Sequence, residues 1–335
     1  MSPPRLALVM GDAAGIGPEL FVRLLAEPAV RARAAILGIG DARVLARGME
    51  QAGVRPAIAV ERDLDAALAR ATVGAPAFWD RGDCDPADCP PARVSAAAGL
   101  AALEAYRAAL DLARAGRIDA ITFTPFNKQA IRLVHRSYED EVVEAVEHLG
   151  IRTPCAEFNV IAAFWNARVT SHVPLKDVAG LLSVERIVER IAMTRDALAA
   201  AGIARPRIAV AALNPHAGEG GAFGREEIEV IGPAVERARE LGLPAEGPFP
   251  ADTVFVRAKA GAFDAVVTMY HDQGQIAIKL LGFESGVTVL WGLPVPVTTP
   301  AHGTAFDIVG TRRAALGPSL EAVRLALRLA QSGRG

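Results

Sequence analysis

Cysteine is scarce in this sequence, since its 335 residues contain only Cys84, Cys89 and Cys155. An odd number of cysteines without a C-x-x-C pair argues against a disulfide framework and against a zinc ribbon. Free cysteines usually behave as small apolar residues, so we expect these three to be structurally incidental. The cytoplasm is the predicted location, because disulfide-poor chains are typical of that compartment.

The sequence also lacks a long apolar run and a marked charge imbalance. No run reaches the roughly 18 residues that a membrane span needs. The formal net charge is −2 and the pI is about 6.3, so neither a nucleic acid nor a membrane surface is an expected partner. The first apolar run, residues 6–10, is too short for a signal peptide and is expected to be a buried strand.

What the sequence does contain is enough apolar residues, 51% of the chain, for a large core. This allows one two-lobed enzyme or two ordinary domains. Short apolar runs alternate with longer Ala/Leu/Arg/Glu segments, which is typical of an α/β protein with a largely parallel sheet. Strands are expected at 6–10, 34–39, 118–123, 207–213, 265–269 and 287–290, and a long helix capped by Ser95 is expected at 95–115.

Polar and glycine residues cluster just past three of these expected strands. The segments are Thr-Pro-Phe-Asn-Lys at 124–128, Asn-Pro-His-Ala-Gly-Glu-Gly-Gly at 214–221 and Tyr-His-Asp-Gln-Gly at 270–274. Open α/β sheets bind their ligands beyond the carboxyl ends of the strands. This organisation predicts an enzyme.

Three of the six histidines lie at such strand ends: His172, His216 and His271. Three imidazoles could converge on one divalent metal and leave a coordination position open for substrate oxygens. The ion would then act as a Lewis acid. The alternative is that each histidine only forms hydrogen bonds within its own loop, and no H-E-x-x-H motif decides between the two.

Two carboxylates and one lysine are further candidates for the chemistry. Asp272 adjoins His271 and Asp252 follows a proline-rich turn, so either could orient a metal-binding imidazole or transfer a proton. Asp252 could instead cap a helix. Lys279 could offer a cation to an anionic substrate, or it could lie on a solvated helix face.

Two glycine-containing turns could contact a cofactor. The glycines at 11–17 do not follow the G-x-G-x-x-G fingerprint, and such turns more often solve a tight strand-to-helix connection than bind phosphate. The segment Ala-His-Gly-Thr-Ala-Phe-Asp-Ile at 301–308 is better placed, because backbone approach at Gly303 and neighbouring polar side chains would suit an adenosine group.

Taken together, these segments resemble the 4-hydroxythreonine-4-phosphate dehydrogenase family of vitamin B6 (pyridoxine) synthesis. The ordered strings at 214–221 and 270–274 carry most of the resemblance. It extends almost the whole length of the chain, over residues 11–19, 124–128, 170–178, 213–221, 247–253, 270–282, 286–294 and 302–310.

The resemblance implies a fold like that of isocitrate and isopropylmalate dehydrogenases, with two α/β lobes and the active-site cleft between them. We expect residues 1–125 and 300–335 in the first lobe, and residues 126–299, with the metal and dimer contacts, in the second. The resemblance also implies a homodimer whose cleft borrows residues from the partner subunit.

The resemblance further implies NAD-linked oxidation of a secondary alcohol and metal-assisted loss of CO2 from the resulting keto acid. Its metal ligands match His172, His216 and His271, and zinc, cobalt, manganese or magnesium is the expected ion. The positions of Asp252, Asp272 and Lys279 line the family's site, together with Lys128 as a substrate contact. The loop His302, Gly303, Thr304, Ala305 and Asp307 is similar to the adenosine-binding loop of the wider fold family.

The sequence departs from the family pattern at positions expected to hold the substrate. Glu139 and Asp140 replace a His-Thr pair, Thr288 replaces an Asn, and Val297 replaces a phosphate-binding Arg. Fewer cations and more carboxylates disfavour a phosphate dianion. We therefore hypothesise a paralogue that acts on an unphosphorylated hydroxy acid or a dihydrodiol carboxylate.

Alternatives to this hypothesis remain open. Lys128, Arg132 and Arg136 could replace the lost phosphate contacts, which would retain the phosphorylated substrate. A metal-dependent lyase or hydrolase without NAD could use Glu139 or Asp140 as its base. A non-catalytic binding protein on a dehydrogenase fold is the third alternative.

Overall fold

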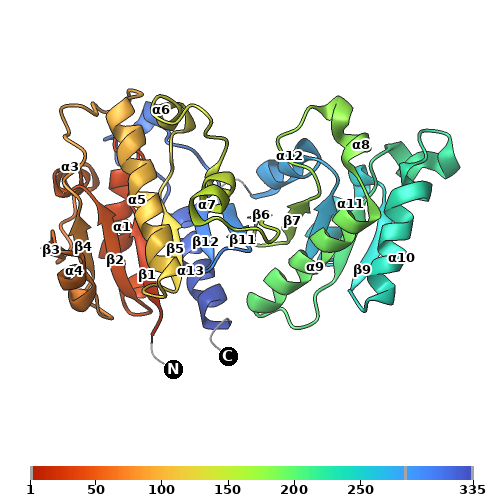
Figure 1. The fold of residues 1–335 in the computed structure, drawn as a ribbon, viewed down its shortest axis with the longest axis horizontal. Coiled ribbons are helices and arrows are strands. Elements are labelled where there is room, and N and C mark those ends of the chain that lie inside the picture. Colours follow the sequence, from red (N-terminus) through yellow and green to blue (C-terminus); the bar gives the residue numbers. More distant parts are fainter. Residues whose placement is uncertain (1–2, 283–284, 333–335) are drawn as a thin grey trace. The chain divides into compact units, whose positions relative to one another are not determined.

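The computed structural model describes residues 3–282 and 285–332, and the chain divides into two compact units that are described one at a time (Figure 1). Unit 1 combines the residues up to Cys155 with those from Gly292 onward, and unit 2 is the continuous segment Ala156–Trp291. The boundaries predicted from the sequence were near 125 and 299. Residues 126–155 belong to unit 1 because α6 and α7, two helices of this segment, pack against α5.

Unit 1 is a parallel sheet with helices packed on it, in the strand order β3-β4-β2-β1-β5-β12. Helix α5 packs against β1, β2 and β5, and α13 packs against β5 and β12. Its elements are β1 (Arg5–Val9), α1 (Gly17–Ala26), α2 (Pro28–Arg31), β2 (Ala35–Gly40), α3 (Ala42–Ala52), β3 (Ala59–Glu61), α4 (Leu64–Arg70), β4 (Ala77–Asp80), α5 (Ala96–Arg114), β5 (Ala120–Phe123), α6 (Lys128–Arg132), α7 (Glu141–Leu149), β12 (Val297–Pro300), η4 (Phe306–Ile308) and α13 (Gly317–Ser332).

Unit 2 contains a mixed sheet in the order β11-β6-β7-β10-β8-β9, in which β6 runs antiparallel to both of its neighbours. The pairs β7–β10, β10–β8 and β8–β9 are parallel. Its elements are β6 (Ala156–Val160), β7 (Trp165–Arg168), η1 (Leu175–Asp177), α8 (Val178–Leu181), α9 (Val184–Ala200), β8 (Ile208–Ala211), η2 (Pro215–Gly221), η3 (Glu227–Ile231), α10 (Gly232–Glu240), β9 (Ala245–Phe249), α11 (Ala251–Lys259), β10 (Ala265–Thr268), α12 (His271–Gly282) and β11 (Val287–Trp291).

Each unit has its own apolar core. In unit 1, Leu6 and Leu8 of β1 pack with Phe21 of α1 and Leu327 of α13. In unit 2, Val266 of β10 lies in a cluster with other buried side chains of the strands and helices. Burying a Leu or Phe side chain contributes about 1.5–3 kcal/mol relative to leaving it exposed. The strand pairings and the helices packed on the sheets confirm the predicted α/β class with a largely parallel sheet.

Several predicted elements are also confirmed in detail. The helix expected at 95–115 is α5, and Ser95 caps it by accepting the backbone N–H of Ala98 at 3.1 Å. The strands expected at 6–10, 34–39, 118–123, 207–213, 265–269 and 287–290 are β1, β2, β5, β8, β10 and β11. Within the described residues, no helix is long and apolar enough to cross a bilayer.

Candidate active site

The three candidate metal-binding histidines follow three adjacent strands of unit 2. His172 comes after β7, His271 begins α12 after β10, and His216 lies in η2 after β8. Because β7, β10 and β8 are parallel neighbours, their carboxyl ends lie at the same edge of the sheet. The sheet topology therefore brings the three loops to one edge.

The structure brings two of these imidazoles into direct proximity. The ring centroids of His172 and His271 are 5.6 Å apart, at an interplanar angle of 42°. Both rings line a small cavity of about 250 Å³ together with Ser171, Tyr270, Asp272 and three apolar residues. This cavity is the part of unit 2 where predicted site residues meet.

His216 is not part of that pair. Within residues 3–282 and 285–332, no three His, Cys, Asp or Glu side chains are grouped closely enough to hold a metal ion. His216 is exposed and its ring lies 6.2 Å from the ring of Phe223, measured between centroids. Convergence of all three histidines on one ion stays a prediction.

The turn that carries His216 has an uncommon backbone conformation. Residues 216–221 all have positive φ angles, between 44° and 101°. His216, Ala217 and Glu219 are not glycines, and left-handed conformations at such residues persist only where the surrounding structure holds them. The turn therefore needs an external support.

Glu227 supplies that support. Its side chain is buried, and its Oε1 accepts the backbone N–H groups of Leu213 and Asn214 at 2.8 and 2.7 Å. Its Oε2 accepts the amide of Asn214 at 2.9 Å. Sequence reasoning missed Glu227, because it lies in the π-helix η3, outside the glycine-rich segment that it supports.

Hydrogen bonds also tie the three strand ends to one another. Gln273 accepts the N–H of Met269 at 2.7 Å and donates to the carbonyl of Ala212, beyond β8, at 2.6 Å. The hydroxyl of Thr170, beyond β7, donates to the carbonyl of Met269 at 2.8 Å. The loops that carry the histidines are thus held to a common frame, which favours a preorganised site.

Asp272 is placed to orient the imidazole of His271. Its Oδ1 lies 2.7 Å from Nδ1 of His271, which identifies Nε2 as the nitrogen available to a metal ion. Asp252 is an exposed residue in the first turn of α11, whose N-cap is Pro250, so Asp252 is not the helix cap. Its charge still complements the N-terminal end of the helix dipole.

The other candidate substrate contacts in unit 2 lie on α12 and β11. Lys279 is an exposed residue of the last turn of α12. Thr288 lies opposite Asn159 of β6, and its hydroxyl accepts the Asn159 amide at 3.3 Å. Asn159 also accepts from the buried Arg168 at 2.7 Å.

The remaining substrate candidates lie in unit 1. Asp140 is buried and caps α7, because its Oδ1 accepts the N–H groups of Val142 and Val143. Glu139 is exposed, and its backbone carbonyl accepts from Nζ of Lys128 at 3.3 Å. Sequence reasoning did not anticipate the capping role of Asp140.

The candidate cofactor loop, residues 302–307, contacts the turn after β1. The carbonyl of Thr304 accepts the N–H of Ile16 at 3.1 Å, and Ala305 has a φ of 42°. Burial lowers the pKa of His302, whose Nδ1 lies 3.1 Å from the carbonyl of Gly303 and whose buried Nε2 has no hydrogen-bond partner. Gly303 and Asp307 are exposed, so this loop presents both backbone and polar groups.

Asp12, in the same turn, is a site candidate that sequence reasoning missed. Its side chain is buried, and Oδ2 has no hydrogen-bond partner, while Oδ1 accepts the N–H of Ala14 at 2.9 Å. Burial raises the pKa of Asp12, although Asn127 and Arg47 act in the opposite direction. Its signal in the sequence was a carboxylate directly after a glycine at a strand end.

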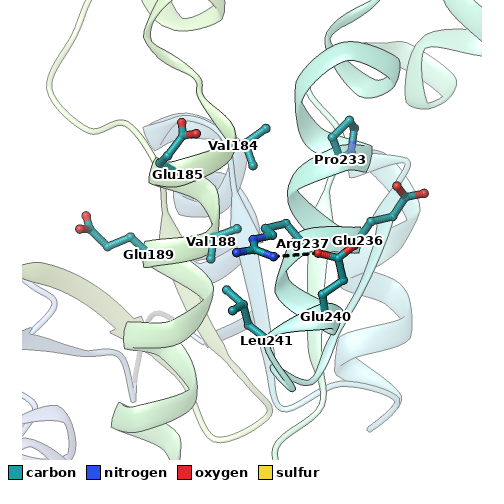
Figure 2. A pocket seen from close by; sticks show the side chains of 9 residues that line it. All are labelled: Val184, Glu185, Val188, Glu189, Pro233, Glu236, Arg237, Glu240 and Leu241. Carbon is teal, nitrogen blue, oxygen red and sulfur yellow. Dashed lines mark hydrogen bonds and ion pairs between the residues drawn. The ribbon is translucent and has the colours of Figure 1, made fainter.

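A larger groove of about 640 Å³ lies between α9 and α10 (Figure 2). It contains none of the predicted site residues. Four glutamates line it, and its one arginine, Arg237, forms an ion pair with Glu240 at 2.9 Å. This acidic lining disfavours an anionic ligand, and the candidate site stays at the strand ends.

Comparison with known proteins decides the family. Residues 32–326 match the sequence profile of the family described as "Pyridoxal phosphate biosynthetic protein PdxA". The chain belongs to this family. Its relatives are named as dehydrogenases, and the chain is accordingly an oxidoreductase that acts on a CH–OH donor.

The chain is similar to named proteins over nearly its whole length. It is 51% identical over 335 residues to the "Putative 4-hydroxythreonine-4-phosphate dehydrogenase 2" of Rhizobium meliloti, covering 99% of this chain and 94% of the relative. A crystal structure of a 4-hydroxythreonine-4-phosphate dehydrogenase from Burkholderia phymatum matches with a TM-score of 0.79 and 40% identity, covering 98% and 99%. A terephthalate 1,2-cis-dihydrodiol dehydrogenase from Burkholderia xenovorans matches with a TM-score of 0.66 and 29% identity, covering 97% and 98%.

Proposed function

We propose that this PdxA-family protein is an NAD-dependent and divalent-metal-dependent dehydrogenase that acts on an unphosphorylated hydroxy acid or a dihydrodiol carboxylate. The reaction oxidises a secondary alcohol and leads to decarboxylation. The observation that carries the proposal is the state of the substrate positions: Asp140 caps a helix, Glu139 is exposed, and Val297 is fully buried in β12.

Two of the three proposed metal ligands, His172 and His271, support a divalent-ion site. His172 and His271 are adjacent, and the carboxylate of Asp272 fixes the ring of His271 in the manner of many metal-binding histidines. His216 would be the third ligand, and three imidazoles favour a transition metal such as zinc or cobalt over magnesium. When bound, the ion supplies Lewis-acid chemistry for the oxygens of the substrate.

The chain's own residues orient the substrate and handle its proton. Lys279 offers a cation to the substrate carboxylate, and Thr288 offers a hydroxyl. Asp272 and Asp252 are the exposed carboxylates available for proton transfer. Asp272 therefore has two proposed roles, as the partner of His271 and as a candidate base.

The loop at 302–307 is proposed to hold the adenosine part of NAD. Its support is the unpartnered, buried Nε2 of His302, which ordinarily needs a hydrogen-bond partner. The lowered pKa keeps this imidazole neutral near pH 7, so it can accept or donate without adding a charge. His302 and Thr304 supply the polar groups, and Gly303 permits close backbone approach.

The substrate positions favour a molecule without phosphate. An arginine is the residue best suited to bidentate phosphate binding, and Val297 offers no charge in its place. The buried Arg168 is not available either, because it forms an ion pair with Glu157 at 2.6 Å and donates to Asn159. The similar structure from Burkholderia xenovorans is named for a dihydrodiol substrate, and this name supports the proposal.

The second candidate is 4-hydroxythreonine-4-phosphate itself, as the names of the other two relatives imply. One observation favours it. Lys128 and Arg132 both donate to the carbonyl of Glu139, at 3.3 and 3.4 Å, so two cations converge at that point of unit 1. These cations could bind a phosphate in place of the missing arginine.

A homodimer is proposed from the exposed apolar side chains of unit 2. Leu175, Ile276 and Leu280 are 69%, 60% and 81% exposed, far more than such residues usually are. Leu175 follows His172 by three residues, and Ile276 and Leu280 follow His271 on the same helix, α12. Light scattering coupled to size-exclusion chromatography tests this, and a monomer at micromolar concentration would refute it.

The proposed function is tested by NADH formation. The metal-loaded enzyme is offered 4-hydroxythreonine-4-phosphate, then unphosphorylated hydroxy acids and dihydrodiol carboxylates, each with NAD. Turnover of an unphosphorylated compound with kcat/KM at least about 100-fold higher supports the proposal, since this corresponds to roughly 2.7 kcal/mol of transition-state preference. Preference for the phosphorylated compound would instead establish the second candidate.

A further inference from the structure

Two of the three cysteines lie in contact with each other in unit 1. Cys84 and Cys89 belong to the irregular segment between β4 and α5, and their sulfur atoms are 3.3 Å apart. Both side chains are buried, with 2% and 0% exposure. From the sequence these cysteines were expected to be incidental, because free cysteines usually behave as small apolar residues.

The surroundings of the two sulfur atoms differ. Arg47 donates from Nη2 to the sulfur of Cys89 at 3.4 Å, and from Nη1 to the Cys89 carbonyl at 2.9 Å. On the side of Cys84, the backbone N–H donates to the carboxylate of Asp41 at 2.9 Å. A cation beside one thiol of a pair stabilises the thiolate of that thiol.

We propose that Cys84 and Cys89 are a redox-modification site, at which a hydroperoxide converts the two thiols into an intramolecular disulfide. Cys89 is the attacking thiol and Cys84 is the resolving thiol. This site is separate from the candidate active site, since neither cysteine is part of it.

The chemistry balances with a hydroperoxide as the oxidant. The Cys89 thiolate attacks the peroxide, so that an S–O bond forms, the O–O bond breaks, and the leaving alkoxide or hydroxide takes up a proton. The Cys84 sulfur then attacks the resulting sulfenic acid, an S–S bond forms, the S–O bond breaks, and water leaves with the Cys84 proton. Two thiols lose two hydrogens in total, and the peroxide is reduced to an alcohol (or water) and water.

The pKa values of the two thiols support the assignment of roles. The hydrogen bond with Cys84, followed by the contact with Arg47, lowers the pKa of Cys89 to about 7, against the opposing effect of burial. The hydrogen bond with Cys89 and burial raise the pKa of Cys84. Of the other charged groups that affect the pair, Asp12 opposes ionisation of Cys89, and Asp41 and Asp83 oppose that of Cys84.

The geometry requires only a small movement to form the bond. A disulfide has an S–S distance of about 2.05 Å, so the two sulfur atoms must approach by roughly 1.2 Å from their present 3.3 Å. The segment that carries them forms turns rather than a helix or strand, and such segments open locally more readily than a core strand. Because both thiols are buried, a small peroxide is expected to reach them through this local opening.

The pair is connected to the turn that follows β1. The same Nη2 of Arg47 that contacts Cys89 donates to the carbonyl of Ala13 at 2.6 Å. Ala13 adjoins Asp12. Three residues further on, the backbone N–H of Ile16 donates to the carbonyl of Thr304 in the candidate cofactor loop. When Cys89 is oxidised, Arg47 loses the thiolate that it contacts. A shift of Arg47 would then be passed through Ala13 to the candidate cofactor loop.

The test is a titration of the folded, full-length protein with hydrogen peroxide, followed by alkylation of the remaining thiols and peptide mass analysis. The expected product is a peptide containing residues 84–89 that is lighter by two hydrogen atoms and resists alkylation until it is reduced. Cys155→Ser is the matched control, because it removes the third thiol and leaves the pair intact. It is expected to oxidise like the unmodified protein.

Two single variants separate the roles of the thiols. Cys84→Ser is expected to accumulate a sulfenic acid at Cys89 that dimedone traps, and Cys89→Ser is expected to leave Cys84 largely unmodified. In the unmodified protein, the rate of disulfide formation is expected to rise about tenfold between pH 6 and pH 8. The proposal would be overturned if Cys84 and Cys89 could both still be alkylated after peroxide treatment. It would also be overturned if Cys155 were oxidised first. The measurement on the unmodified protein stands even if a serine variant fails to fold.

Discussion

Oε2 of Glu227 occupies the space where a side chain at Gly218 would have to lie, since a Cβ on Gly218 would be 2.7 Å from that oxygen. Gly218 has a φ of 80° and is buried in the turn that carries His216. The Glu227 carboxylate can take this position only because Gly218 has no side chain. This contact makes Glu227 a positioning residue for His216.

Glu227→Gln is expected to lower metal affinity and kcat/KM by about 10–100-fold, the usual effect of removing a group that supports a metal-binding histidine. The amide keeps one acceptor oxygen but places an NH2 group against the Asn214 amide, which can no longer donate to it. Isothermal titration with zinc measures the affinity. Glu229→Gln, on the exposed face of the same π-helix, is the matched control and should leave affinity unchanged. Equal metal affinity in the two variants would contradict the positioning role.

Asp272→Asn is expected to weaken metal binding by about tenfold, because the amide orients the His271 imidazole less firmly than the carboxylate does. Cobalt substitution followed by visible absorption spectroscopy reports the geometry of the ion and detects a change that a purely structural role would not cause. Asp196→Asn, an exposed aspartate of α9, serves as the comparison. An unaltered cobalt spectrum and affinity in Asp272→Asn would remove Asp272 from the site.

Asp12→Asn is expected to stabilise the fold at neutral pH. Burial raises the pKa of Asp12, so the folded state binds this proton more tightly than the unfolded state does. The stability of the unmodified protein therefore falls as pH rises from the ordinary aspartate pKa through the raised value, and it stays reduced above that window. The neutral asparagine avoids this loss, and we expect a gain of roughly 1 kcal/mol at pH 8 that vanishes near pH 3.

Urea unfolding of both proteins at a series of pH values measures this difference. Asp88→Asn, at an exposed position in the segment between β4 and α5, is the control and should show no such pH-dependent gain. A gain for Asp12→Asn that is the same at every pH would mean that charge is not its cause.

Gly274→Ala is expected to destabilise the protein by about 1–3 kcal/mol, the usual cost of overpacking. A Cβ there would lie 2.0 Å from Oδ1 of Asn166, and the amide of that residue is held by the carbonyls of Ala167 and Val266. Gly180→Ala is the matched control, because nothing lies within 4 Å of its Cβ position in α8. Thermal unfolding compares the two, and similar melting temperatures would show that the Asn166 contact relaxes without cost.

The strand and helix pattern could be predicted because it depends on local sequence. Ser95 is followed by a run of alanines and leucines, and this alone indicates a capped helix. The antiparallel placement of β6 could not be predicted in the same way. One of its two antiparallel partners, β7, follows directly in the chain, but the other, β11, lies more than one hundred residues later, and no periodicity within either strand encodes that pairing.

The candidate site was predictable to a similar extent. His172 and His271 could be placed at strand ends from the sequence, and their rings do lie together. The left-handed turn at His216 could not be predicted, because its conformation is imposed by a carboxylate in a different element. Asp12 was missed for a related reason: only the folded chain shows that burial leaves one of its oxygens without a partner.

The segments before and after unit 2 both contribute to unit 1, and this affects how the protein is made. Strand β12 pairs with β5, and α13 packs against both, yet the whole of unit 2 lies between β5 and β12 in the sequence. On the ribosome, the edge of β5 stays unpaired while the residues of unit 2 emerge. A translation product that stops before residue 297 would expose this strand edge, and exposed strand edges promote aggregation.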